Sequence, residues 1–188
     1  AMKTIKNISL FGMLTILIAS MVSCELDEYN PSGNTADAVW STPEGFQTLV
    51  NACYSNQRTW YGKIDGVFLS ETGTDLWFNK SKDGYSRELS KYENFTPSTG
   101  NFNKSQWPLL YEAVNLCNSG IGRIGQAGFT SDEVRKQKEG EIRFLRAFYY
   151  FHIVETWGGV VLLTEETKEP VLTAHRSPVE DFYDLMIE

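Results

Sequence analysis

The strongest hydrophobic pattern lies in residues 140–157, where six aromatic side chains fall within one stretch. Apolar residues recur at helical spacing on two faces, the first with Ile142, Leu145, Tyr149 and Ile153, the second with Phe144, Phe148, Phe151 and Val154. A helix that is apolar on nearly every side is predicted to be buried inside a helical assembly. Thr130 and Glu133 predict a capping box at its start, and Gly158 predicts its end after Trp157. Gly140, inside the helix, predicts the close approach of a neighbouring helix.

Three further helices are predicted from the same kind of pattern. The first covers residues 42–61, with Thr42 as N-cap and Pro43 at the first helical position. The second covers residues 105–124, and a capping box at Ser177 and Glu180 begins the last one. The sequence stops within that last helix, which predicts a chain truncated at the C-terminus.

Residues 62–104 show no lasting helical period, and glycine, serine, asparagine and threonine recur in them. Residues 89–95 alternate weakly, a pattern that fits a short strand or an extended loop. An irregular connection of this length is uncommon inside a compact domain unless it is functional. This segment is therefore the first place to look for ligand-binding residues.

The N-terminal residues have the pattern of an export signal. Lys3 and Lys6 precede an apolar run over residues 8–22, which is shorter than the roughly 20 residues of a bilayer span. Residues 1–23 are interpreted as a secretory signal peptide, with a buried core helix as the alternative. Residues 24–41 are polar and turn-prone, so we expect a spacer there and a helical domain over residues 42–188.

Composition excludes some classes of partner. The net charge is −7, and it becomes more negative when a signal peptide with its two lysines is removed. An acidic domain repels phosphate backbones, so nucleic acid is not expected as a partner. No Cys-x-x-Cys motif or cysteine–histidine cluster indicates a metal, and no cofactor is expected. Cys53 and Cys117 lie on apolar helical stripes and are expected to be buried free thiols, although a disulfide between them is allowed in an exported protein.

Residues 21–24, Met-Val-Ser-Cys, resemble a bacterial lipobox, in which cleavage precedes a cysteine that then carries lipid. The resemblance implies that Cys24 is the lipidated first residue of the mature chain. Acyl chains of this kind tether a domain to a membrane surface without a spanning helix. Met21 stands where leucine is usual, and the alternative is an ordinary signal peptide with an incidental cysteine.

Four segments in order resemble the SusD/RagB family of outer-membrane nutrient-binding lipoproteins. They are residues 24–27 with Pro31, residues 107–111 with Asn115, Asn118 and Ile121, residues 140–163, and residues 176–180 with Tyr183. Ile142 replaces a common alanine and Val161 a common proline. The resemblance spans nearly the whole mature chain, and because family members are several times longer, this chain is similar to their N-terminal part.

The resemblance implies an all-α fold of tetratricopeptide-like helical pairs with long irregular loops. It also implies a lipid-anchored protein on the outer surface of a Gram-negative outer membrane. Such a protein binds a glycan, passes it to a TonB-dependent transporter of SusC type and catalyses no reaction. The alternative is a peptide-binding member or a tetratricopeptide-like interaction scaffold.

Family members commonly use the region between the first two helices in glycan binding, and here it holds several suitable residues. We expect Trp77 to stack on a sugar ring while Asp75 and Asn79 hydrogen-bond to hydroxyl groups. The alternative is that Trp77 only packs the loop onto the helices. Other suitable residues are Glu71, Tyr85 and Arg87, whereas Trp60 and Tyr61 are expected in the core. Glu71 and Asp75 could instead be the paired carboxylates of a glycoside hydrolase, the enzymatic alternative.

Overall fold

The computed structural model describes residue 33 and residues 35–62, 64–80, 85–96 and 106–188. The chain divides into two units, Ala1–Asn34 and Thr35–Glu188, and the fold described below belongs to the second. The predicted signal peptide and Cys24 lie outside the described residues. Every regular element in the described part is helical, which confirms the predicted all-α class. No helix among the described residues combines the length and apolar character that a membrane span requires.

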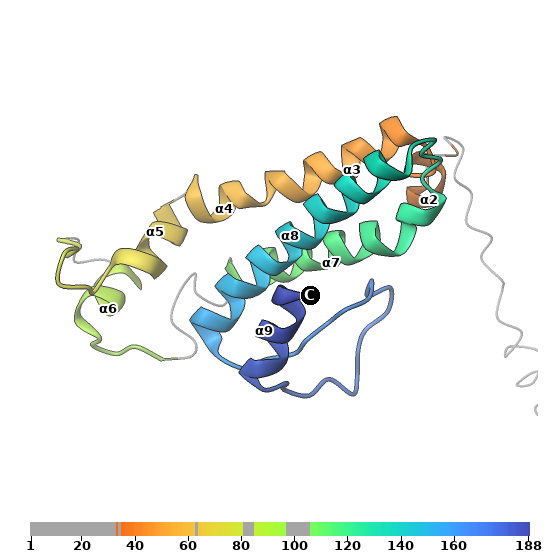
Figure 1. Cartoon of the computed structure of the whole chain (residues 1–188). Helices are drawn as coiled ribbons and strands as arrows, with labels where there is room; N and C mark the ends of the chain where they lie inside the picture. Colours follow the sequence, from red (N-terminus) through yellow and green to blue (C-terminus); the bar gives the residue numbers. More distant parts are fainter. Residues whose placement is uncertain (1–32, 34, 63, 81–84, 97–105) are drawn as a thin grey trace, which may run out of the picture. The chain divides into compact units, whose positions relative to one another are not determined.

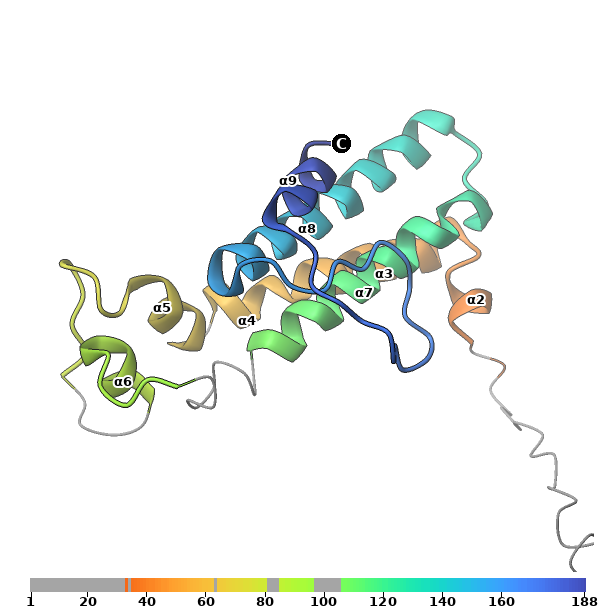
Figure 2. The ribbon, with the colours of Figure 1, turned by 90° about the horizontal axis from the view of Figure 1, so that it is seen from below.

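Three long helices form the centre of this unit, and α9 packs against one of them (Figures 1 and 2). α7 and α8 are antiparallel neighbours joined by a short turn, and α3 packs on both. The elements are α2 (Ala36–Val39), α3 (Pro43–Ser55), α4 (Gln57–Tyr61), α5 (Ile64–Glu71), α6 (Tyr85–Lys91), α7 (Trp107–Arg123), the 3₁₀ helix η2 (Ile124–Gln126), α8 (Asp132–Trp157) and α9 (Val179–Ile187).

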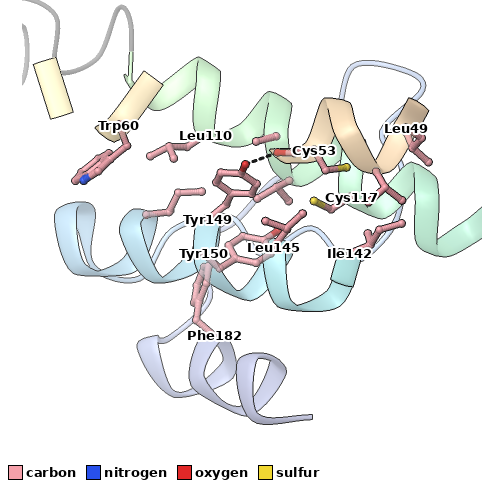
Figure 3. Close-up of a cluster of buried hydrophobic side chains, with 14 of the residues drawn as sticks. Leu49, Cys53, Trp60, Leu110, Cys117, Ile142, Leu145, Tyr149, Tyr150 and Phe182 are labelled. Carbon is pink, nitrogen blue, oxygen red and sulfur yellow. Dashed lines mark hydrogen bonds between the residues drawn. The ribbon is translucent and has the colours of Figure 1, made fainter. Parts of the chain in front are cut away.

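The predicted helix over residues 42–61 begins as expected but is divided in two. Thr42 is the N-cap of α3, and its hydroxyl oxygen accepts the Gly45 amide at 3.1 Å. The helix breaks at Asn56 into α3 and α4. Near the break, the Tyr149 hydroxyl donates to the carbonyl of Cys53 (Figure 3), an oxygen that an unbroken helix pairs with the amide four residues later. A tertiary hydrogen bond thus competes with the helical one at this point.

The long helix α8 starts one residue later than the predicted capping box. Ser131, not Thr130, is the N-cap, and its hydroxyl oxygen accepts the Val134 amide at 3.4 Å. The predicted end is confirmed, since Gly158 follows the last helical residue with φ of +70° and its amide donates to Val154 at 2.8 Å. Both neighbouring hydroxyls could serve as caps, so the sequence alone did not fix which one does.

Gly140 does not mark a helix contact, contrary to the prediction, because a Cβ added there would meet nothing within 4 Å. The close approach is at Gly120 of α7 instead. A Cβ on Gly120 would lie 2.8 Å from Leu49 Cδ2 of α3 and 2.9 Å from Ile142 Cδ1 of α8. The three central helices therefore meet at a residue that has no side chain.

The core contains one of the two apolar faces predicted for α8. Ile142, Leu145, Tyr149 and Ile153 are all buried, as predicted. Figure 3 shows the first three among the core side chains. The second face is divided, because Val154 is buried and Phe148 packs against the core, whereas Phe144 is 63% exposed and Phe151 is 46% exposed. The prediction that α8 is buried on nearly every side is therefore wrong for its outer face.

Cys53 and Cys117 are free and buried, as predicted, and their sulfur atoms face each other between α3 and α7 (Figure 3). A hydrogen bond with Cys53, together with burial, raises the pKa of the Cys117 thiol. The pair thus behaves as part of the apolar core.

The segment predicted as irregular contains two short helices, α5 and α6. Each spans about two turns, too few for a helical period to stand out in sequence. The alternation over residues 89–95 does not produce a strand, since α6 continues to Lys91 and Tyr92 and Asn94 both have φ of +56°. Within the described residues, 72–80 and 92–96 keep the predicted irregular character.

Two predictions at the ends of the domain also differ from the structure. The predicted spacer contains α2, whose N-cap Thr35 accepts the Ala38 amide at 3.2 Å. The predicted capping box of the last helix is absent, because Pro178 precedes α9 and provides no side-chain cap. Ser177 instead donates its amide to the Val160 carbonyl at 2.7 Å, which holds it in the extended chain before the helix.

Candidate functional site

A pocket of about 550 Å³ lies among α4, α5, α6 and the C-terminal part of α8. Its walls combine aromatic rings with short polar side chains. The aromatic residues that line it are Trp60, Tyr61, Tyr92, Phe95 and Phe151. The polar ones are Ser70, Glu71, Thr72, His152, Glu155 and Thr156.

One wall of the pocket is built around His152 on α8. The imidazole stacks on the Trp60 indole, with ring centroids 4.2 Å apart and 28° between the planes. Its Nε2 lies 3.3 Å from the Tyr61 hydroxyl, which comes from the end of α4. Burial lowers the pKa of His152 to about 4, so the ring is neutral at physiological pH. Phe151, the preceding residue, presents a partly exposed ring to the same pocket.

The opposite wall is held in place at Gly73, between α5 and α6. The Tyr92 hydroxyl donates to the Gly73 carbonyl at 3.3 Å. Gly73 has φ of +87°, and a Cβ there would lie 2.5 Å from the Leu89 carbonyl oxygen. Only glycine satisfies both conditions, so this contact between the two short helices depends on it.

Thr72 contributes to the pocket a buried polar atom that lacks a hydrogen-bond partner among the described residues. The residue is 7% exposed, and its hydroxyl oxygen has no hydrogen-bond partner within the described part of the chain. A buried hydroxyl without a partner costs about 1–3 kcal/mol. A ligand hydroxyl at this position would remove that cost.

The residues predicted to bind ligand lie beside this pocket and do not line it. Trp77 is 46% exposed, its amide donates to the Thr74 hydroxyl at 3.2 Å, and its carbonyl accepts the Gly73 amide at 3.2 Å. The backbone amide of Asn79 donates to the Ser90 hydroxyl at 3.2 Å. Gly73 thus connects the loop of Asp75, Trp77 and Asn79 to the pocket residue Tyr92.

Other predictions for this region had mixed outcomes. Glu71 lines the pocket but Asp75 does not, so the structure does not bring the two carboxylates together there. Trp60 is in the core as predicted, with 6% exposure, whereas Tyr61 is 64% exposed, so its core prediction is wrong. We did not identify three of the pocket residues, Thr72, Tyr92 and His152, from the sequence. The adjacent aromatic pairs Trp60-Tyr61 and Phe151-His152 are a sequence feature that could have pointed to the aromatic wall of the pocket.

A second cavity, of about 510 Å³, lies between α2, α7 and residues 164–168. Arg123 dominates it, with ion pairs to Asp37 at 2.7 Å and Glu166 at 2.6 Å and its guanidinium 5.6 Å from the centre of the Trp40 ring. Burial raises the pKa of Glu166, but hydrogen bonds from Arg123 and Ser119 outweigh it, and the net pKa is lowered. Lys168, 3.7 Å from Glu166, adds a second positive charge, so two basic and two acidic side chains balance in this ion-pair cluster. We assign the cluster a structural role. No group of three or more potential metal ligands occurs in the described ranges.

Comparison with known proteins identifies the family. A family profile described as "Starch-binding associating with outer membrane" (SusD-like) matches residues 26–188. A SusD-like protein of Formosa agariphila is 28% identical over 190 residues, which cover 99% of this chain and 37% of that protein. A SusD-like protein of Bacteroides ovatus is 24% identical and covers 92% of this chain and 32% of its own length. The chain therefore belongs to the SusD-like family, a family of binding proteins, and the predicted family is confirmed.

Solved structures agree with this assignment. The structure of a SusD-like protein from Bacteroides fragilis matches 80% of this chain and 29% of that chain, with a TM-score of 0.59 and 26% identity. A structure described as a laminarin-binding SusD-like protein matches 77% of this chain and 32% of that chain, with a TM-score of 0.68 and 20% identity. The latter similarity supports the fold alone. The chain spans about a third of the length of the curated relatives it matches.

Proposed function

We propose that this protein is a cell-surface lipoprotein that binds a glycan and delivers it to a TonB-dependent transporter of SusC type. The lipid on Cys24 would anchor it to the outer membrane. Membership of a starch-binding, outer-membrane-associated family supports this proposal, as does the fold shared with a laminarin-binding protein. The observation that carries it is the aromatic pocket with the unpartnered Thr72 hydroxyl.

The pocket has the two kinds of surface that a sugar ring needs. Sugars place C–H groups on the faces of the ring, which pack on aromatic side chains, and hydroxyls around its edge, which need hydrogen-bond partners. Tyr61 and Phe151 supply partly exposed rings, and Thr72 supplies a buried hydroxyl that has no partner in the described part of the chain. The neutral His152 can either donate or accept.

The loop of Asp75, Trp77 and Asn79 extends the proposed site beyond the pocket. In this proposal Trp77 stacks on a further sugar ring, and Asp75 and Asn79 hydrogen-bond to its hydroxyls. The 46% exposure of Trp77 leaves part of its ring accessible for such a contact. The link through Gly73 supports a continuous binding surface from the pocket to this loop.

Thr72→Val is expected to weaken glycan binding about fivefold to tenfold, because valine keeps the shape of threonine but removes the hydroxyl. Stability should stay the same or rise, since the unpartnered oxygen is gone. Thr72→Ser, which keeps the hydroxyl, is the matched control and should bind like the parent. Binding is measured by affinity electrophoresis and calorimetry against a panel of polysaccharides. Equal affinities for the parent and Thr72→Val would remove Thr72 from the site.

Trp77→Ala is expected to lower affinity for long glycan chains by about tenfold, since stacking on an aromatic side chain is worth about 0.5–1.5 kcal/mol beyond the area buried. A short oligosaccharide that fills only the pocket should be affected less. Leu76→Ala is a suitable control, because Leu76 is 86% exposed on the same loop and has no aromatic ring. If Trp77→Ala binds long chains as well as the parent does, Trp77 only packs the loop.

A further inference from the structure

We propose that the aromatic pocket selects uncharged glycans and rejects glycans that carry carboxylate, sulfate or phosphate groups. The inference rests on the proposed function, because it names the class of glycan that the same site binds. It follows from the charged side chains that line the pocket in the described part of the chain, which are both acidic.

The charged residues that line the pocket, within the described part of the chain, are Glu71 at the end of α5 and Glu155 on α8. Neither carboxylate forms an ion pair with another described residue. Glu155 accepts a hydrogen bond from the Tyr183 hydroxyl of α9, which fixes its position without neutralising its charge. The pocket therefore carries two negative charges, one from α5 and one from α8, that no described basic residue pairs with.

No described side chain in the pocket supplies the positive charge that an anionic sugar needs. His152 is the one ring there that could carry a proton, and burial keeps it neutral at physiological pH by lowering its pKa to about 4. Among the described basic residues, Arg58 on α4 and Arg87 and Lys91 on α6 are the nearest in sequence, and they do not line the pocket. Proteins that recognise carboxylate or phosphate groups commonly do so with arginine, whose paired N–H donors match the two oxygens.

The cavity around Arg123 does not provide an alternative site for an anion. Its arginine, Arg123, is already bound to Asp37 and Glu166, and Lys168 lies 3.7 Å from Glu166. An anionic ligand would have to displace one of these carboxylates. The net charge of −7 adds a weaker, long-range repulsion of the same sign.

Repulsion of this kind has a measurable size. Two like charges several ångströms apart near a protein surface repel by about 1 kcal/mol or more, and salt screens part of that repulsion. A carboxylated glycan should therefore bind about tenfold more weakly than the same glycan without carboxylates. The difference should become smaller when the salt concentration is raised.

The experiment compares matched ligands on the same protein. The purified protein is first tested against laminarin, starch and galactomannan, whose hexose units carry primary hydroxyls, and then against the best of these after oxidation of those hydroxyls to carboxylates. Calorimetry at about 10 mM and about 150 mM salt gives the ratio of the two affinities. We expect the oxidised glycan to bind about tenfold more weakly at low salt and the ratio to shrink at the higher salt.

A charge variant assigns this effect to the pocket. In Glu71→Gln/Glu155→Gln, the affinity ratio between neutral and oxidised glycan should fall to about twofold or less, because the repulsion in the pocket is gone. Glu44→Gln/Glu133→Gln makes the same change in net charge at the first turns of α3 and α8, away from the pocket, and should keep the parent ratio.

Each outcome has a distinct meaning. Equal or stronger binding of the oxidised glycan, or a ratio that the two pocket substitutions leave unchanged, would overturn the charge selection while the glycan-binding proposal stands. Failure to bind any of the polysaccharides, together with binding of a peptide library, would overturn the proposed function and the charge selection with it. A neutral-to-oxidised ratio that disappears only in the pocket variant supports both.

Discussion

Asn118→Leu is expected to lower the free energy of unfolding by about 3 kcal/mol, because it leaves several buried polar groups without partners. Asn118 is 2% exposed, and its amide nitrogen donates to the carbonyls of Leu163 at 2.8 Å and Glu165 at 3.1 Å. Its amide oxygen accepts from Arg146 at 3.0 Å. Arg146 is itself 5% exposed, and burial is the main reason that its pKa is lowered. Leucine has a similar volume but can replace none of these hydrogen bonds.

Asn115→Leu is the matched control for this prediction. Asn115 lies one turn earlier on α7, and its side-chain oxygen accepts the Thr167 amide at 2.6 Å. It is only half-buried, so water can replace the lost bond and the expected cost is below about 1 kcal/mol. Urea unfolding followed by tryptophan fluorescence measures both variants. A cost for Asn118→Leu no larger than that of the control would show that Arg146 and the two carbonyls find other partners.

These hydrogen bonds explain what the family-like residues of α7 do in this chain. The Tyr111 hydroxyl donates to the Val161 carbonyl at 2.7 Å, and Asn115 and Asn118 hold the residues that follow. From the other side, the Tyr150 hydroxyl donates to the Leu163 carbonyl at 2.6 Å. The extended segment after α8 is thus fixed across α7 by side chains. The sequence shows these residues as a motif but not their role, because their partners are backbone atoms about 45–52 positions away.

The elements predicted from long patterns were correct, and the errors lie where tertiary contacts decide. α7 and α8 have several turns of periodic sequence, so their extents were predicted to within a few residues. The exposed face of α8 was predicted wrongly, because Phe144 has the same apolar character in sequence as the buried Leu145. Periodicity shows that a face is apolar, but not whether another element covers it.

The pocket was only partly predictable for a related reason. Of the residues singled out between the first two long helices, Glu71 lines the pocket, whereas Asp75, Trp77 and Asn79 do not. Thr72 has no sequence signal, since what distinguishes it is burial without a partner. His152 comes from α8, some 80 positions later, and only the packing of α4 on that helix makes it part of the same wall as Trp60.

Acid is expected to destabilise the protein through His152, by about 3 kcal/mol between pH 6.5 and pH 4. The pKa of this histidine is lowered by burial from 6.5 to about 4 in the folded protein. Between these two values the unfolded chain binds one more proton than the folded protein does, so stability falls as the pH falls. The contribution of the neutral His152 to the free energy of unfolding is fully present above pH 6.5 and is lost by about pH 4. The protonated ring would lie against Trp60, Phe148 and Phe151, none of which can stabilise a buried cation fully.

His152→Phe isolates this contribution, because phenylalanine keeps an aromatic ring beside Trp60 but cannot be protonated. Urea unfolding of the parent should show a slope of about 1.4 kcal/mol per pH unit from this residue between pH 4 and 6.5, and the variant should lack it. His175→Phe, which changes the other histidine of the chain at an exposed position, should keep the parent slope. The carboxylates of Asp37, Asp132 and Glu166 have lowered pKa values and add acid sensitivity to all three proteins alike. Only the difference between the two histidine variants therefore tests the prediction, and identical slopes would mean that His152 is protonated in the folded protein without cost.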